Sequence, residues 1–494
     1  MNTVAALLAP NVARHPRRAA YFCEGETLTY SDLDERSGRF GQGLLASGVK
    51  AGDRALLVLP DGFPFLYAFL GCLKAGIWPA LVSPLLSKDD TGFVLSDSEA
   101  TALVTAPDLP AAAADSPHLR TRLALDPDSM GRFLSSAPGG IETAPADDDD
   151  TAFFLYTSGT TGEPKGVPHA HGDMPFTADS YGVSILALAP ADTVFSASKL
   201  FFAYGLGNSV SFPLRAGVPA ILHPGKATAD EVVRLFNSHR PTVFFGVPTL
   251  YSLLLRSLDD WTAFGSLRLC VSAGEALPAP LAVEWRSRAG VEVVDGLGTS
   301  ETLHIVLSNR PGAVRPGSAG IPVPGYELRL VDEEGRDVPR GVPGQLLVRG
   351  RSLARSYWKR PEKTSETMLP HGWLRTGDVL IEEAGVYTHQ GRADDMFKVD
   401  AQWISPVQVE SVLYGHAAVK ECAVTATKAE GLVKVGAHVV LGPGFTDSIE
   451  TIASIRRHVL SHLPPHMCPA RFTFCAELPK TATGKVQRFR LRGA

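Results

Sequence analysis

The chain has 494 residues, of which 45% are hydrophobic and 20% charged, and its formal net charge is −5. Single hydrophobic cores stop growing near about 250–300 residues, so a globular chain of this length predicts two or more domains. The slightly acidic balance excludes the basic surface that nucleic acid or an anionic membrane would require.

The first 21 residues predict a helix and not a signal peptide, because Val4, Leu7, Leu8 and Val12 recur at helical spacing and arginines only follow them. No apolar run reaches the ~18–20 residues that cross a bilayer. The six cysteines are scattered, without a C-x-x-C pair or metal-like spacing, and indicate reduced thiols. We therefore expect a soluble, cytoplasmic protein.

Short apolar runs of strand character alternate with helix-like segments between residues 55 and 272. The runs that predict strands are 55–59, 79–82, 102–104, 193–197, 219–222, 242–246 and 267–272. In the stretches 64–75 and 229–238 the apolar residues fall on one helical face. This alternation is typical of the α/β class, so we predict mostly parallel sheets packed with helices.

The stretch 107–150 has a different composition, rich in Ala, Pro, Asp and Ser, and ends in four consecutive aspartates. We interpret it as a solvated surface excursion and not as a metal site, since a linear run does not supply converging carboxylates. From residue 321, short strands such as Glu327–Val331 and 345–349 alternate with tight turns and predict a β-rich subdomain.

The last hundred residues indicate a separate, small α+β domain of βαβ character. Strands are expected at 419–425 and 434–441, and a helix at 449–463. The predicted organisation is therefore an N-terminal domain of residues 1–391, a hinge at 392–395 and a C-terminal domain of residues 396–494.

A loop rich in hydroxyls and glycines, YTSGTTGEPKG at residues 156–166, follows an apolar run. Backbone N–H groups and hydroxyls of such a loop can surround phosphates, and Lys165 adds a positive charge. It is not a Walker A motif, since no Gly is followed after four residues by Gly-Lys-Ser/Thr. The segment GLGTSE at 296–301 is not a dinucleotide motif, because Glu301 stands in place of the final glycine.

The loop resembles the signature of the adenylate-forming superfamily, which holds acyl- and aryl-CoA ligases, peptide-synthetase adenylation domains and luciferases. The resemblance implies ATP and Mg²⁺ as cofactors, with Thr160 and Glu301 as catalytic residues and metal ligands. Ser300 matches the hydroxyl that touches the α-phosphate. The further residues that it assigns to ATP are Thr157, Ser158, Gly159, Thr161, Gly162 and Lys165 of the loop, Gly296, and Gly274, Glu275, Ala276 and Asp295 around adenine.

Three motifs nearer the C-terminus complete the resemblance. Asp378 in WLRTGD, residues 373–378, matches the carboxylate that holds the ribose hydroxyls, and Arg392 matches a second ribose contact. Asp394 matches the hinge residue between the domains. Lys485, which ends PKTATGK at 479–485, matches the catalytic lysine that bridges the substrate carboxylate and the α-phosphate. A cation between two anions offsets their repulsion and stabilises the charge of the transition state.

The segments KLFFAYGLGN at 199–208 and LHIVLSN at 303–309 resemble benzoate-CoA ligases and their near relatives. By that resemblance the acyl pocket is lined by Ala203, Tyr204, Gly298, His304 and Ile305. An aromatic wall, a small residue and a branched aliphatic suit a flat ring and leave a fatty chain little room. His304 and Tyr204 can also hydrogen-bond a ring substituent, so benzoate, hydroxybenzoates and aminobenzoates all stay open.

The chain departs from the family after the hinge, where it reads KVDAQW at 398–403. Ala401 replaces a glycine that the family's second conformation places against the pantetheine arm, where a Cβ can block close approach. Gln345 replaces the usual Glu of its motif, a minor change. Adenylation is unaffected, but the acceptor stays open between CoA and a carrier-protein thiol, an amine or a hydroxyl.

We predict an acid-thiol ligase that activates an aromatic acid with ATP as aryl-AMP, releases pyrophosphate and passes the aryl group to coenzyme A. Its partners are the acid, ATP and CoA, with a carrier protein and a homodimer as further options. A nucleotide- or acid-binding sensor is disfavoured because Thr160, Glu301, Asp378, Arg392 and Lys485 are all retained. No feature supports a luciferase-like oxygenase.

Overall fold

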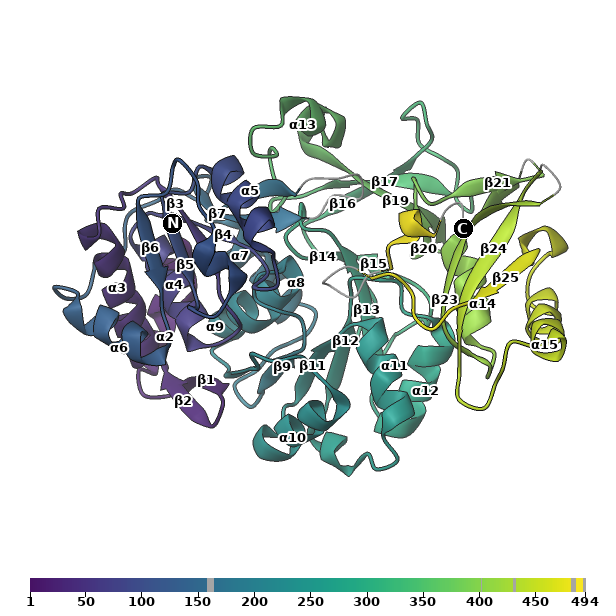
Figure 1. The fold of residues 1–494 in the computed structure, drawn as a ribbon, viewed down its shortest axis with the longest axis horizontal. Coiled ribbons are helices and arrows are strands. Elements are labelled where there is room, and N and C mark those ends of the chain that lie inside the picture. Colours follow the sequence, from purple (N-terminus) through teal and green to yellow (C-terminus); the bar gives the residue numbers. More distant parts are fainter. Residues whose placement is uncertain (158–163, 401, 430–431, 481–485, 492–494) are drawn as a thin grey trace.

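The computed structural model describes residues 1–157, 164–400, 402–429, 432–480 and 486–491. The first part of the chain lies at one end of the long axis, residues from about 190 to 310 lie in the middle, and the segment after residue 390 lies at the other end (Figure 1). No helix of the described chain is long and apolar enough to span a membrane.

Two large sheets in the first 322 residues are mostly parallel, which confirms the predicted α/β class. One has the strand order β6-β5-β3-β4-β7-β8 and the other β15-β14-β13-β12-β11-β9-β10-β1-β2. Antiparallel pairing occurs at their edges, where β8, β14, β15 and β2 lie. The bounds are β1 Ala19–Cys23, β2 Glu26–Thr29, β3 Arg54–Val58, β4 Trp78–Leu81, β5 Ala102–Thr105, β6 Thr121–Ala124, β7 Thr151–Thr157, β8 Lys165–Ala170, β9 Val194–Ser196, β10 Ala220–Leu222, β11 Val243–Gly246, β12 Leu269–Ser272, β13 Val293–Gly298, β14 Ile305–Ser308 and β15 Ile321–Pro322.

The helices pack on these sheets through their apolar sides, and every predicted strand and helix of this region is present within a few residues. Strands such as β5, β11 and β12 are buried along their whole length, as expected for parallel strands covered on both faces. The helices are α1 Thr3–Leu7, α2 Ala9–Arg14, α3 Tyr30–Ala46, α4 Phe63–Lys74, α5 Lys88–Ser98, α6 Pro127–Ser136, α7 Asp173–Thr177, α8 Ala203–Leu206, α9 Phe212–Ala216, α10 Ala229–His239, α11 Pro248–Ser257 and α12 Ala279–Ala289.

The interpretation of residues 107–150 as a surface excursion was only partly right. The segment supplies β6, which extends the first sheet, and α6, whose Met130 and Leu134 are buried. A capping box between Asp126 and Ser129, with Pro127 at the first helical position, starts α6 inside a stretch whose composition had indicated a loop. The four aspartates remain exposed, as predicted.

The predicted β-rich region is a five-stranded antiparallel sheet in which β16, β17, β19 and β18 are neighbours and β20 pairs with β19. After it, β21 and β22 form a hairpin, β23 and β24 pair antiparallel, and β24, α15 and β25 form a parallel βαβ unit. The bounds are β16 Glu327–Val331, β17 Gly344–Arg349, α13 Pro361–Thr367, β18 Met368–Leu369, β19 Trp373–Glu383, β20 Val386–Arg392, β21 Phe397–Val399, β22 Gln402–Ile404, α14 Pro406–Tyr414, β23 Val419–Ala429, β24 Leu432–Leu441, α15 Ile449–Leu460 and β25 Arg471–Phe474.

The chain after residue 398 has a hydrophobic core of its own. Val399, Ile404, Val409 and Leu413 pack with buried residues of β23, β24 and α15 in this cluster, separate from the clusters of the large sheets.

Candidate active site

The described ends of the loop at 156–166 are fixed in antiparallel register, since Thr157 pairs with Lys165 at the end of the β7–β8 ladder. Tyr156 anchors β7 by donating from its hydroxyl to Asp97 Oδ2 over 2.8 Å. The predicted phosphate residues Ser158, Gly159, Thr160, Thr161 and Gly162 lie outside the described residues.

Tyr357 contacts both Lys165 and Glu301 beside this loop. The Lys165 Nζ lies 4.3 Å from the centre of the Tyr357 ring, and the Tyr357 hydroxyl donates to Glu301 Oε1 over 2.7 Å. Burial lowers the pKa of Lys165, and the nearby Glu301 carboxylate opposes that shift. Tyr357 thus has a cation over its ring face and a carboxylate at its hydroxyl.

The Glu301 carboxylate suits a magnesium ion that carries phosphates. No group of three or more His, Cys, Asp or Glu in the described parts of the chain could hold a metal by itself. Magnesium is usually held by one or two carboxylates together with substrate phosphates and waters, so a single carboxylate beside a predicted phosphate loop fits this ion.

Asp378 is buried on β19 and meets two residues of β20. Its Oδ1 lies 3.2 Å from His389 Nε2 and 3.4 Å from the Arg392 guanidinium. The Asp378 carboxylate raises the pKa of Arg392, and Glu301 adds to that effect. The structure therefore brings the predicted ribose residues close to the predicted magnesium ligand, although β13 and β19 belong to different sheets.

The predicted adenine residues Gly274, Glu275 and Ala276 follow β12, and Asp295 lies on the adjacent strand β13, opposite Ser272. The φ of Gly274 is +95°, which favours glycine. Asp295 is buried, and its Oδ1 has no hydrogen-bond partner among the described residues. A buried carboxyl oxygen without a donor can accept from an amino group, such as that of adenine.

Asp295 makes a testable contribution to the pH dependence of stability. Burial raises its pKa to about 8, against about 3.9 in an unfolded chain. The native state then binds more protons than the unfolded state between these values, so stability from this group falls as pH rises through that window. We expect the Tm of Asp295→Asn, relative to the wild type, to rise from about pH 5 to about pH 8. Thermal melts in matched buffers measure this, and a constant difference would contradict it.

The predicted acid pocket is an aromatic cluster around His304. The His304 ring lies 4.5 Å from the Phe212 ring and 5.6 Å from those of Tyr181 and Tyr204, measured between centroids. The Tyr204 hydroxyl donates to the carbonyl of Val271 over 3.2 Å. Ala203 begins α8 and is buried, and Ile305 is buried at the start of β14. The five predicted pocket residues therefore lie on α8, on the β13–β14 strand pair or, for His304, in the turn directly before β14.

His304 is a neutral group in this cluster. It is 3% exposed, and burial lowers its pKa to about 3. Its Nε2 lies 3.2 Å from Asn208 Oδ1, which can only accept, so Nε2 donates and Nδ1 is left as an acceptor. Nδ1 is buried and has no partner within the described chain.

Glycines allow the close contacts around His304. A Cβ on Gly207 would overlap Cδ2 of the His304 ring and come within 2.7 Å of Nε2. A Cβ on Gly298 would overlap the backbone carbonyl of His304, and one on Gly296 would lie 2.8 Å from Ile305 Cγ2. The packing around the predicted acid pocket therefore requires glycine at these positions.

Asp394 lies in an exposed turn directly after β20, where Asp395 N donates to the carbonyl of Arg392 over 2.9 Å. Ser300 follows β13, and its carbonyl lies 2.8 Å from His169 Nε2. Lys485 and Ala401 lie outside the described residues. The charge of Glu275 adds to that of Glu410 in raising the pKa of Arg488. Glu275 therefore lies close to the C-terminal tail.

Four further residues contact the predicted site residues without being assigned by any motif. Gly207 and Asn208 lie inside the quoted motif at 199–208, so helical spacing from Tyr204 could have placed them near the pocket. Tyr357 and His389 carried no local signal, because their contacts with Glu301 and Asp378 join segments that are distant in sequence or depend on strand register.

Comparison with known proteins identifies the family of the chain. A family model described as AMP-binding enzyme matches residues 8–358, and one described as AMP-binding enzyme C-terminal domain matches residues 408–485. The benzoate–CoA ligase of Thauera aromatica is 41% identical over 97% of this chain and 93% of its own length.

Two solved structures share the whole fold. A benzoate CoA ligase from Burkholderia xenovorans LB400 has a TM-score of 0.93 and 41% identity, covering 100% of both chains. The anthranilate CoA ligase AuaEII, solved in complex with anthranoyl-AMP, has a TM-score of 0.95 and 38% identity over 100% of this chain and 96% of that one. The chain therefore belongs to the AMP-binding enzyme family, the adenylate-forming enzymes that its motifs resemble.

Proposed function

We propose that the protein activates an aromatic carboxylic acid with ATP as an aryl-adenylate and transfers the aryl group to the thiol of coenzyme A. The observation that carries this proposal is the position of two sites on one strand pair. The nucleotide segment ending at Glu301 and the pocket residues His304 and Ile305 lie on either side of one turn, with Gly298 paired to Ile305. An acid in the pocket would thus lie next to the phosphates.

The pocket would orient the acid by charge. Its walls are aromatic and its His304 is neutral, so the ring enters and the carboxylate stays at the polar side. One carboxylate oxygen then attacks the α-phosphorus of ATP, the bond to the β-phosphate oxygen breaks, and pyrophosphate leaves.

Each nucleotide residue takes one part in this step. Lys165 and the loop hold the phosphates, Asp378 and Arg392 the ribose, and Asp295 the adenine. Magnesium, which Glu301 and Thr160 would hold, neutralises phosphate charge when bound. Lys485 positions the two reacting anions.

The segment of residues 396–494 would act as a lid on residues 1–391. It has a hydrophobic core of its own, and it joins the rest through the turn at 392–395, where Asp394 is exposed. After the adenylate has formed, a rotation of this segment about Asp394 would turn its face with Lys485 away from residues 1–391 and bring its face around Asp400 toward them.

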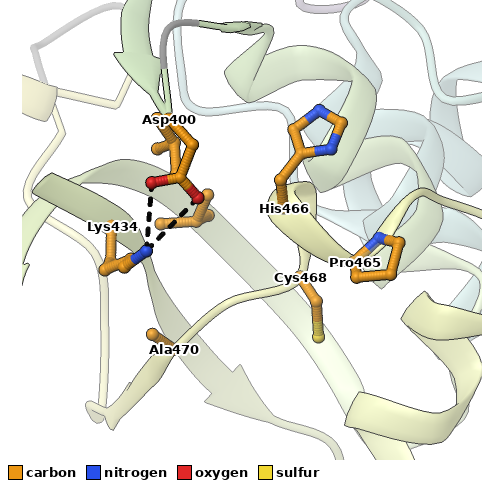
Figure 2. A pocket seen from close by; sticks show the side chains of 8 residues that line it. Asp400, Lys434, Pro465, His466, Cys468 and Ala470 are labelled. Carbon is orange, nitrogen blue, oxygen red and sulfur yellow. Dashed lines mark hydrogen bonds and ion pairs between the residues drawn. The ribbon is translucent and has the colours of Figure 1, made fainter.

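A pocket in the lid is a suitable place for part of CoA. It has a volume of about 510 Å³ and is lined by Asp400, Lys434, His466 and Cys468 among others. Figure 2 shows Asp400 and Lys434 facing each other, with Pro465, His466 and Cys468 on the neighbouring segment. It adjoins the position where the family resemblance implies passage of the pantetheine arm.

We expect Lys434→Ala to raise the KM for CoA about two- to fivefold, the effect of one exposed ion pair, without changing adenylation. Steady-state aryl-CoA formation measures the KM, and ATP–pyrophosphate exchange measures adenylation. Lys428→Ala, at an exposed position of β23, is the matched control. If Lys434→Ala slows ATP–pyrophosphate exchange by the same factor, Lys434 has no specific role at the CoA step.

The experiment that tests the proposed function is ATP–pyrophosphate exchange with a panel of acids, in the absence of CoA. Benzoate, hydroxybenzoates and aminobenzoates should support exchange, whereas hexanoate and longer fatty acids should not. A preference for acids with a ring hydroxyl or amino group would indicate a hydrogen bond to Nδ1 of His304. Exchange with fatty acids alone would reject the aromatic substrate class.

A further inference from the structure

The antiparallel pair β19–β20 contains a β-bulge next to Asp378. Asp378 is opposite Arg392 and Val379 is opposite Gly391, but Leu380 is opposite His389, so Gln390 is an extra residue in β20. Side chains alternate between the faces of a strand, so Leu380 shares a face with Asp378. The extra residue therefore brings His389 to the face of Asp378, where unbroken register would have placed Gln390.

His389 uses this position to contact the carboxylate. Its Nε2 lies 3.2 Å from Asp378 Oδ1, and a carboxylate only accepts, so the ring donates from Nε2. The Asp378 carboxylate thus receives a donor from His389 on one side of the bulge and from Arg392 on the other.

The bulge itself is held by the C-terminal part of the chain. Ser405 Oγ donates to the carbonyl of Gln390, the extra residue, over 2.6 Å. Ser405 is buried, and it also caps α14 by accepting from Gln408 N over 3.0 Å. The register that points His389 at Asp378 is therefore fixed by a hydrogen bond from outside the sheet.

We propose that His389 is a positioning residue that fixes the Asp378 carboxylate for the hydroxyls of the ATP ribose. This inference rests on the proposed function, in which Asp378 binds the ribose. His389 would thereby strengthen the binding of ATP without touching the nucleotide itself.

Kinetics with ATP and with 2′-deoxy-ATP test the proposal. We expect His389→Phe to raise the KM for ATP roughly 10- to 150-fold, as for one lost hydrogen bond to a charged group, with kcat at saturating ATP unchanged. The preference of the same variant for ATP over 2′-deoxy-ATP should fall. His389→Gln, which keeps an N–H donor, should restore most of both values, and Thr388→Val is the control on the same strand.

Asp378→Asn distinguishes a failure of the role of His389 from a failure of the ribose assignment of Asp378. It should weaken ATP binding and lower the preference, and adding His389→Phe should then change nothing further. If Asp378→Asn has these effects and His389→Phe has neither, the inference about His389 is wrong. If Asp378→Asn leaves both values unchanged, the ribose assignment fails and the role of His389 fails with it. Should His389→Phe not fold, as judged by thermal melting, His389→Asn replaces it, since its amide is too short to reach Asp378.

Discussion

Lys485→Ala is expected to lose aryl-adenylate formation by about 10²- to 10³-fold, the size reported for removing one preorganised charge or donor from a transition state. The same variant should still convert chemically synthesised aryl-AMP and CoA to aryl-CoA at the wild-type rate. The first half-reaction brings two anions together and needs the cation, whereas a thiol attacking the mixed anhydride does not.

The described residues on each side of 481–485 support this role. Lys480 and Val486 form an antiparallel bridge, and Gln487 N donates to the carbonyl of Pro479 over 2.8 Å. Lys480 pairs with Glu421 at 2.7 Å. Residues 479–480 and 486–487, on each side of this segment, are thus tied to each other, and Lys480 is tied to β23.

The two half-reactions are measured separately, by ATP–pyrophosphate exchange and by aryl-CoA formation from added aryl-AMP. Lys420→Ala, a lysine of β23, is the control for loss of a positive charge in the same domain. Equal loss of both half-reactions in Lys485→Ala would refute the assignment.

Gly207→Ala is expected to lower kcat/KM for the aromatic acid roughly 10- to 100-fold, the cost of overpacking a buried contact, while the KM for ATP stays unchanged. The added Cβ would overlap the His304 ring, which packs on Phe212 and donates to Asn208. Either the ring or the backbone at Gly207, directly after α8, must move, and both border the predicted acid pocket.

A second substitution tests the cause. In Gly207→Ala/His304→Ala the overlap is absent, so the Tm should recover relative to Gly207→Ala even though acid binding does not. Gly265→Ala, where a Cβ meets nothing within 4 Å, is the control and should be neutral. An unchanged acid KM in Gly207→Ala would show that His304 is not part of the pocket wall.

The fold could be predicted wherever burial and periodicity carried the signal. The parallel strands β3, β5, β11 and β12 are continuous apolar runs because both faces are covered, and the sequence marks them within a residue or two. The helix α6 was missed because it depends on a local capping box and on packing against α3, not on a long apolar stripe.

Residues of the candidate site could be predicted where they belong to one sequence motif. They could not be predicted where strand register or tertiary packing brings distant residues together. The residues from Gly296 to Ile305 were identified from sequence and lie together on one strand pair. His389 could not be found, since a one-residue bulge decides which side chain of β20 meets Asp378. Tyr357 reaches Glu301 across 56 residues, a contact that only tertiary packing specifies.

We expect the aryl group to pass from AMP to coenzyme A. The most direct measurement is continuous pyrophosphate release with benzoate and Mg-ATP, with and without CoA, followed by mass spectrometry of the products. We predict sustained turnover only when CoA is present, with benzoyl-CoA as the product. Release of pyrophosphate and aryl-AMP that CoA does not change would contradict the claim and assign the aryl group to a carrier-protein thiol, an amine or a hydroxyl.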